Sequence, residues 1–288
     1  MAVVRLRSLG DCVLTTPAIE ILKQSRPDAE IGVVVEDRFA DVFEGNPSVS
    51  AVLRPELNAL RRFRPDLCLN LHGGTRSMVL TGSSGARIRA GFAHHRGARI
   101  YNCRIPRAQE ILGEERVVHT AEHLASAMFH LGAPRVEIPR ARLFAERAPA
   151  SPPYAVIHAV AAQAEKTWSP EGFLAVAEFV SREFEPVFIA GPGEDLSPFA
   201  KYRTIVGAPL GETKSLLQSA SLFVGNDSGP AHIAAAFGVP VVVLFGPSDP
   251  VVWAPWRTAS QVLVNRENIR NIPVEAVTAA VTSLRVAS

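Results

Sequence analysis

A carboxylate in a position suited to a general base lies close to the beginning of the sequence. Asp11 ends the stretch Ser8-Leu9-Gly10-Asp11, which separates an apolar stretch from one with helical spacing. Beside a ligand site, a carboxylate at a helix start can accept a proton from a bound hydroxyl, and Gly10 permits a tight turn and close approach of the ligand. An Asp there also caps the helix and complements its dipole. Both interpretations of Asp11, base and helix cap, follow from this spacing.

The stretch Gly225-Asn226-Asp227-Ser228-Gly229-Pro230-Ala231-His232 has the residue types of an anion site. Gly229 and Pro230 are typical of a turn that leads into the first helical residues. Free backbone N–H groups at a helix start bind anions such as a diphosphate, and Ser228 adds a hydroxyl donor. His232, about one turn into the helix, can point toward the same anion. A capping turn followed by a buried histidine is the structural alternative.

Lys166 and Glu194 are candidate contacts for the two ends of a nucleotide. The chain has 26 Arg but only four Lys, and Lys166 lies in a loop just before the helix start at Ser169-Pro170. Its ammonium group can neutralise a phosphate there, although a solvated loop lysine has the same pattern. Glu194 follows an apolar strand in Gly191-Pro192-Gly193-Glu194-Asp195. A carboxylate after a strand of a nucleotide-binding domain can accept hydrogen bonds from ribose hydroxyls.

These residues belong to an alternation of apolar strands and helical stretches that occurs in both halves of the chain. The predicted strands are 2–6, 31–35, 66–71, 154–158, 186–190, 222–225 and 239–245. The predicted helices are 13–25, 55–63, 170–184, 213–219 and 231–237. This alternation is typical of a parallel sheet in an α/β fold, and the proline-rich segment 134–153 between the halves predicts a linker. We therefore expect two Rossmann-like domains facing a cleft, with residues 1–149 and 150–288 as their bounds.

The composition excludes several classes of protein. Of 288 residues, 47% are hydrophobic and 20% are charged, with a formal net charge of +2. A chain this apolar can fold, and a net charge near zero is unlike that of a strongly basic nucleic-acid-binding protein. No cysteine has zinc-ligand spacing, no DxD motif occurs, and no apolar run approaches the roughly 20 residues of a membrane span. Charged residues interrupt the N-terminal apolar stretch, unlike a secretory signal. We expect a cytoplasmic protein that holds no metal ion.

Taken together, the motifs resemble those of the ADP-heptose:lipopolysaccharide heptosyltransferase family, glycosyltransferase family 9. The resemblance covers VVRLRSLGDCVLTTPAIEILK at 3–23, GNPSV at 45–49, RPDLCLNLHGGTRS at 64–77, EKTWSPEGF at 165–173, GPGE at 191–194 and NDSGPAHIAAAFGVPVVVLFGPSDP at 226–250. It implies a GT-B fold, an N-terminal domain that binds the acceptor and a C-terminal domain that binds the nucleotide-sugar donor. It also implies inverting sugar transfer without a divalent metal or other cofactor.

The resemblance further implies roles for single residues. Asp11, within the SLGD turn that contains Gly10, matches the proposed general base, and Lys166 matches the lysine that contacts the diphosphate. Glu194 matches the acidic residue on the ribose, with Asp195 as the alternative register. The donor-binding turn is matched by Asp227, Ser228, Gly229 and His232. The chain departs from the family in the loop 159–164, AVAAQA, which lacks the serine or threonine hydroxyls that often contact phosphate.

The expected acceptor is an anionic glycolipid or oligosaccharide. Residues 1–149 carry 21 Lys and Arg against 16 Asp and Glu, whereas residues 150–288 carry 9 against 12. Arginines of the first half can bind phosphates or carboxylates of such an acceptor, or an anionic surface at the cytoplasmic face of the inner membrane. Arg76 and His72, after the third predicted strand, are the candidates nearest the expected cleft. A transferase for another nucleotide sugar and a non-catalytic sugar-nucleotide-binding protein are the alternatives.

Overall fold

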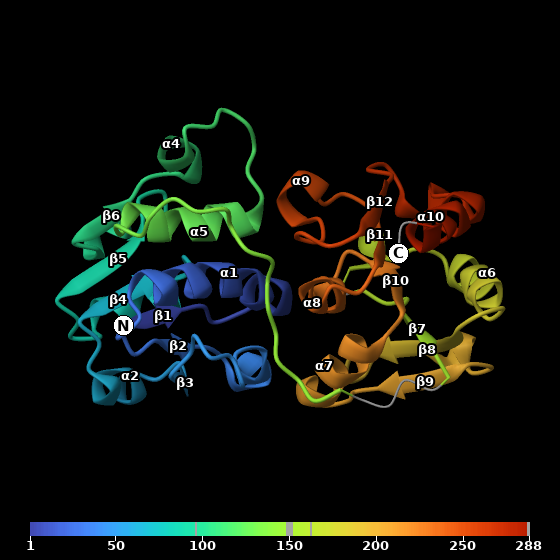
Figure 1. Ribbon diagram of the computed structural model, residues 1–288, viewed down its shortest axis with the longest axis horizontal. Coiled ribbons are helices and arrows are strands. Elements are labelled where there is room, and N and C mark those ends of the chain that lie inside the picture. Colours follow the sequence, from blue (N-terminus) through green and yellow to red (C-terminus); the bar gives the residue numbers. More distant parts are fainter. Residues whose placement is uncertain (96, 148–151, 162, 287–288) are drawn as a thin grey trace. The chain divides into compact units, whose positions relative to one another are not determined.

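Each half of the chain forms its own six-stranded sheet with helices around it (Figure 1). The computed structural model describes residues 1–95, 97–147, 152–161 and 163–286. The chain divides into two units, Met1–Phe144 and Ala145–Ser288. The boundary that we expected, between residues 149 and 150, lies outside the described residues.

The first unit alternates short buried strands with helices. Its strands are β1 (Ala2–Val4), β2 (Gly32–Val34), β3 (Ala51–Leu53), β4 (Leu67–Asn70), β5 (Ile88–Phe92) and β6 (Cys103–Ile105). Its helices are α1 (Leu9–Ser25), α2 (Leu57–Phe63), α3 (Thr75–Gly82), α4 (Ala108–Leu112) and α5 (Thr120–His130), with the 3-10 helices η1 (Asp37–Val42) and η2 (Ala98–Ile100).

The second unit repeats this plan. Its strands are β7 (Tyr154–His158), β8 (Glu185–Ala190), β9 (Arg203–Val206), β10 (Leu222–Asn226), β11 (Val241–Phe245) and β12 (Ser260–Val264). Its helices are α6 (Pro170–Val180), α7 (Leu210–Ser219), α8 (Gly229–Phe237), α9 (Pro250–Trp253) and α10 (Val274–Val286), with the 3-10 helices η3 (Ala164–Lys166), η4 (Ser197–Phe199) and η5 (Ile269–Asn271).

Both sheets have the strand order of a Rossmann fold. The orders are β3-β2-β1-β4-β5-β6 and β12-β11-β10-β7-β8-β9, so each sheet, counted from its own first strand, runs 3-2-1-4-5-6. The described pairs run parallel, with Val4 of β1 opposite Asn70 of β4 and His158 of β7 opposite Gly225 of β10. The prediction of an α/β GT-B fold with two Rossmann-like domains is confirmed.

This strand order marks one point in each sheet where a ligand site is expected. The connections diverge from β1 and β4 in the first unit and from β7 and β10 in the second. In open α/β sheets ligands bind beyond the carboxyl ends of strands at such a switch point. Asp11 and His72 follow β1 and β4, whereas Ser228 follows β10. The fold therefore carries Asp11, His72 and Ser228 to the switch point of their own unit.

Helix packing buries the strands that carry these residues. Helix α1 packs against α5, and α10 packs against α6 (Figure 1). In the hydrophobic core of the second unit, the buried Trp168 ring lies edge-on to Phe173, with 5.1 Å between ring centroids. The Trp168 Nε1 donates to the Ile272 carbonyl at 3.0 Å. Trp168 thereby anchors the loop just after Lys166. In the described part of the chain, no helix combines the length and apolar character needed to span a membrane.

Three helices begin earlier than the spacing of apolar residues predicted, among them α7, which starts at Leu210 rather than Thr213. Helix α1 starts at Leu9 rather than Val13, because Ser8 is its N-cap and the Asp11 carboxylate reaches back to the Ser8 N–H at 3.4 Å. Gly10 therefore lies in the first helical turn, and our expectation of a tight turn there was wrong. Helix α8 likewise starts at Gly229 rather than Ala231, with Ser228 as its N-cap.

Candidate functional site

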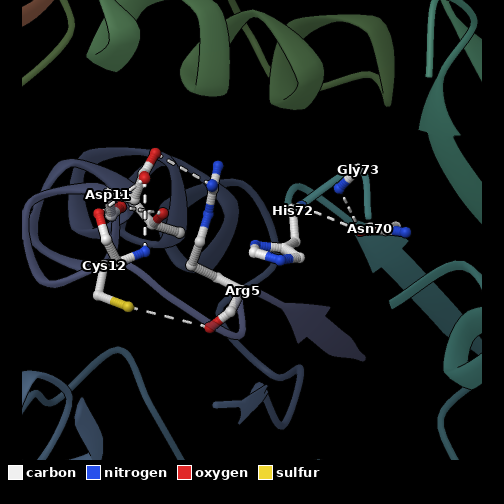
Figure 2. A network of polar contacts seen from close by, with 8 residues as sticks. Arg5, Asp11, Cys12, Asn70, His72 and Gly73 are labelled. Atoms are coloured by element: carbon white, nitrogen blue, oxygen red, sulfur yellow. Dashed lines mark hydrogen bonds and ion pairs between the residues drawn. The ribbon is translucent and has the colours of Figure 1, made fainter. Parts of the chain in front are cut away.

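The carboxylate of Asp11 is held from two sides at the start of α1 (Figure 2). Arg5 Nη1 lies 3.1 Å from Oδ1, and the Ser8 hydroxyl donates to Oδ2 at 3.0 Å. The Arg5 side chain is only 6% exposed, whereas that of Asp11 is 23% exposed. The carboxylate is thus fixed on its buried side and still reaches solvent, as a base for a bound hydroxyl must. Its contact with Ser8 also stabilises the helix start, so the geometry fits both interpretations of Asp11.

Arg5 is a functional candidate that the sequence analysis missed. It is one of the charged residues in the N-terminal apolar stretch, which the sequence analysis used only as evidence against a secretory signal. Burial lowers the pKa of its guanidinium and Asp11 opposes that shift, but an arginine stays charged in proteins. Its Nε is buried without a hydrogen-bond partner. A charged residue just after a fully apolar strand, as here after Val4, was the signal that could have identified it.

His72 lies beside Arg5, in a loop that Asn70 organises (Figure 2). The buried Asn70 side chain accepts from the backbone N–H groups of His72 and Gly73 at 2.9 and 3.1 Å. It donates to the Tyr101 hydroxyl at 2.8 Å. Burial, followed by the positive charge of Arg5, lowers the pKa of His72. The structure thus brings His72 to the same edge of the sheet as Asp11, with a neutral imidazole near pH 7.

Further imidazoles gather around Phe92 at the end of β5. The Phe92 ring stacks on His123 with 4.0 Å between centroids, and the rings of His94 and His95 lie 4.9 Å apart. Burial, together with the neighbouring His94, lowers the pKa of His95 and that of His123 to about 4. Arg5 adds to both shifts. These histidines were not predicted, because His123 lies far along the chain from the adjacent pair His94 and His95, and no sequence spacing connects them.

Arg76 has local partners. It lies in the first turn of α3, and its side chain is 59% exposed. Its Nη1 lies 3.7 Å from Glu36 Oε1, and its Nη2 donates to the Pro55 carbonyl at 3.2 Å. A bound anion would therefore compete with Glu36 for this guanidinium.

Lys166 and Asp227 meet in the second unit. Lys166 Nζ lies 3.3 Å from Asp227 Oδ2, and their side chains are 30% and 10% exposed. The Asn226 carboxamide, at the end of β10, holds the loop because its Oδ1 accepts from the Trp168 N–H at 3.1 Å. The partly exposed ammonium group of Lys166 is thereby fixed near the start of α8.

Gly246, the residue after β11, packs so closely against the same loop that a side chain does not fit there. A Cβ placed on Gly246 would lie 2.6 Å from the Glu165 carbonyl oxygen. Any side chain there would displace the loop that carries Lys166. The turn Gly246–Pro250 thus supports the loop.

Ser228 and His232 sit at the start of α8, where the sequence placed them. The Ser228 hydroxyl lies 3.0 Å from Nδ1 of His158, the last residue of β7. Burial lowers the pKa of His158 to about 4, so its imidazole is neutral near pH 7. His232 is buried within the helix, and Gly229 is the first helical residue. His158 was missed as a site residue because it was counted only as the end of a strand.

The carboxylates of Glu194 and Asp195 have different roles in their loop. Glu194 Oε2 accepts from the Gly191 N–H at 2.6 Å and closes the turn after β8. Asp195 is exposed and accepts from the N–H and the hydroxyl of Ser197, both at 2.8 Å. These hydrogen bonds lower the pKa of Asp195. Among the described residues no three His, Cys, Asp or Glu side chains are grouped to hold a metal ion.

Comparison with known proteins gives the family. Residues 57–273 match glycosyltransferase family 9 (heptosyltransferase), which is most of the chain. The chain belongs to glycosyltransferase family 9. It is 28% identical to lipopolysaccharide heptosyltransferase 3 of Escherichia coli over 293 residues, covering 87% of this chain and 84% of that protein.

Solved structures share the fold of this glycosyltransferase. A family 9 glycosyltransferase from Veillonella parvula has a TM-score of 0.88 at 22% identity, covering 100% of this chain and 97% of that one. The E. coli heptosyltransferase WaaC with ADP has a TM-score of 0.81 at 18% identity, with 98% and 99% covered. The iron-containing dodecameric glycosyltransferase TibC from enterotoxigenic E. coli scores 0.67 at 16% identity, with 99% and 76% covered.

Proposed function

We propose that this enzyme transfers a heptose from ADP-heptose to an acceptor of the lipopolysaccharide-core type, with inversion at the anomeric carbon. The family match and the E. coli relative named lipopolysaccharide heptosyltransferase 3 support the sugar and the acceptor class. The neighbour WaaC with ADP supports the nucleotide. The observation that carries the mechanism is the solvent-reachable Asp11 carboxylate, held at 3.1 Å by the buried Arg5 at the switch point of the first sheet.

Asp11 acts as the general base in this proposal. As the acceptor hydroxyl attacks the anomeric carbon, its proton passes to the Asp11 carboxylate and the bond from the sugar to the diphosphate breaks. The electron pair of that bond leaves with the nucleotide diphosphate. Arg5 and Ser8 keep the carboxylate oriented, which is the pre-organisation that proton transfer needs.

The second unit binds the donor in this proposal. Lys166 and the backbone N–H groups at the start of α8, from Gly229 onward, stabilise the charge that develops on the leaving diphosphate. Asp227, at 3.3 Å, keeps the ammonium group in place before the donor binds. His232 lies one turn into the same helix. Glu194 contacts the ribose through Oε1, because its Oε2 accepts from the Gly191 N–H.

We also propose that transfer needs no divalent metal. The positive charge for the leaving group comes from Lys166 and a helix start, which can replace a metal ion in this role. Because one neighbour, TibC, contains iron, the test includes metal analysis of the purified enzyme. Turnover should survive EDTA, whereas complete loss of turnover in EDTA that magnesium or iron restores would refute this part.

His72 and Arg76 bind the acceptor in this proposal, on the basic first half of the chain. An anionic glycolipid acceptor would be reached at the cytoplasmic face of the inner membrane, through peripheral contact. Flotation with vesicles that contain anionic lipid, compared with neutral vesicles, tests that contact. Equal recovery of the enzyme with both kinds of vesicle would argue against an electrostatic surface.

Donor and acceptor profiling tests the proposed function as a whole. The purified enzyme is screened by thermal shift against ADP-, UDP-, GDP- and dTDP-sugars, and products with core oligosaccharides are identified by mass spectrometry. We expect stabilisation by the ADP-sugar and a mass increase of one heptose. Stabilisation by another nucleotide sugar alone would indicate a different donor, and binding without any product would indicate a non-catalytic protein.

A further inference from the structure

The hydroxyl of Ser228 does not do what a serine at a helix start usually does. A serine N-cap normally accepts a hydrogen bond from a backbone N–H of the first helical turn. Ser228 is the N-cap of α8, but its hydroxyl makes no such bond and lies 3.0 Å from His158 Nδ1. The backbone N–H groups at the start of α8 are thus not satisfied by this side chain. The hydroxyl instead contacts the buried imidazole of His158 at the end of the neighbouring strand β7.

The fold fixes His158 for this contact. His158 ends β7 in register with Gly225 of β10, and it is buried. A Cβ on Gly225 would lie 3.1 Å from the His158 Cβ and 2.9 Å from its carbonyl oxygen. The absence of a side chain at Gly225 therefore lets the imidazole approach the start of α8. Because burial keeps the imidazole neutral, it carries one N–H group.

The location of that one proton decides what Ser228 can do. With the proton on Nε2, Nδ1 accepts from Ser228 and uses the only hydroxyl proton. With the proton on Nδ1, the imidazole donates to the Ser228 oxygen, and the hydroxyl proton stays free for another acceptor. Only the second arrangement makes Ser228 a donor toward a ligand at the helix start.

Other hydroxyls around this site already have hydrogen-bond partners. The Thr167 hydroxyl donates to the Gln163 carbonyl at 3.1 Å, and the Ser169 hydroxyl accepts from Gly172 at 3.1 Å. The loop 159–164 contains no serine or threonine. Among these groups, Ser228 is the hydroxyl at the start of α8, where the backbone N–H groups can hold a diphosphate.

We propose that His158 is a positioning residue, which donates from Nδ1 to the Ser228 oxygen and so directs the Ser228 hydroxyl proton to an oxygen of the donor diphosphate. The inference rests on the proposed role of Ser228 in donor binding. The contact adds a hydrogen bond that strengthens as negative charge develops on the leaving group. His158 therefore acts on turnover through Ser228 without touching the donor.

A pair of substitutions at position 158 separates this role from packing. His158→Asn retains an amide N–H close to the place of Nδ1–H, whereas His158→Leu fills a similar volume without a donor. We expect His158→Leu to lower kcat about tenfold or more, the effect of one hydrogen bond to a charged group. His158→Asn should recover most of that loss. Equal losses in two variants of equal thermal stability would overturn the proposal.

A double-mutant cycle with Ser228→Ala tests the route through the hydroxyl. If His158 acts through Ser228, His158→Leu should lower kcat no further in a Ser228→Ala background. Losses that simply multiply would contradict the inference. If Ser228→Ala by itself changes neither kcat nor ADP affinity, the proposed role of Ser228 in donor binding has failed instead.

The tautomer can be read in the unaltered enzyme, which avoids any variant that folds poorly. Nitrogen-15 NMR of the histidine side chains, assigned with His158→Asn, distinguishes an imidazole protonated on Nδ1 from one protonated on Nε2. We expect His158 to carry its proton on Nδ1 in the complex with ADP. A proton on Nε2 in that complex would overturn the proposal.

Discussion

Replacing Asp11 by Asn removes the proposed base and also unpairs a buried charge, and these two effects can be separated. The Asn keeps an acceptor oxygen for Arg5 but loses the negative charge 3.1 Å from a side chain that is 6% exposed. Loss of a positioned base lowers turnover by about 10²–10⁴-fold. ADP affinity should stay within about tenfold, or 1.4 kcal/mol, because in the proposed function the second unit binds the donor.

The stability cost follows from the burial of Arg5. Removing one partner of a buried ion pair costs about 3–5 kcal/mol. Asp11 is partly exposed and Asn retains a hydrogen bond, so we expect about 2–3 kcal/mol for Asp11→Asn. In the double variant Asp11→Asn with Arg5→Met, the unpaired charge is gone and an unbranched apolar side chain fills its place. Most of the lost stability should return, whereas turnover should not.

The assay combines ADP release, ADP binding and thermal unfolding for both single variants and the double variant. Glu20→Gln is a matched control, because Glu20 lies on the same helix and its ion pair with Arg142, at 3.8 Å, is more exposed. It should leave turnover and stability nearly unchanged. If the double variant regains turnover together with stability, Asp11 serves the fold and not the chemistry, and the reasoning is refuted.

Three further predictions concern the donor, the acceptor and pH. Lys166→Met should lower turnover by about 10²–10³-fold and weaken ADP binding. The control Lys201→Met, at an exposed lysine, should change neither quantity. Equal effects of the two substitutions would contradict a contact between Lys166 and the diphosphate. Arg76→Ala should raise the KM for acceptor more than that for donor, as steady-state kinetics with each substrate varied would show. The Tm should fall as the pH is lowered from 6.5 toward 4, because His123 and His158 have pKa values of about 4 in the folded enzyme and take up protons on unfolding. His123→Gln should flatten that fall, and a Tm that does not change over this range would argue against neutral buried imidazoles.

The α/β class could be predicted because buried parallel strands are continuous apolar runs. The strands β7 and β11 are such runs, and the former was predicted to the residue. Edge strands were missed, since β3 has only three half-buried residues and β9 is largely exposed. A short strand at an edge has too few apolar residues for a pattern, and pairing with its neighbour defines it.

The local sequence determined which side chains stand at the ends of the central strands. The motifs formed by these side chains indicated the family and the positions of Asp11, Lys166 and Ser228. It could do so because a strand, a turn and a helix start are each coded within a few residues. The partners of these side chains were decided by the tertiary structure. Lys166 meets Asp227 across 61 positions, and Ser228 meets His158 across 70. Those contacts exist because parallel strands bring carboxyl ends that are distant in sequence to one edge of a sheet, which no local spacing encodes.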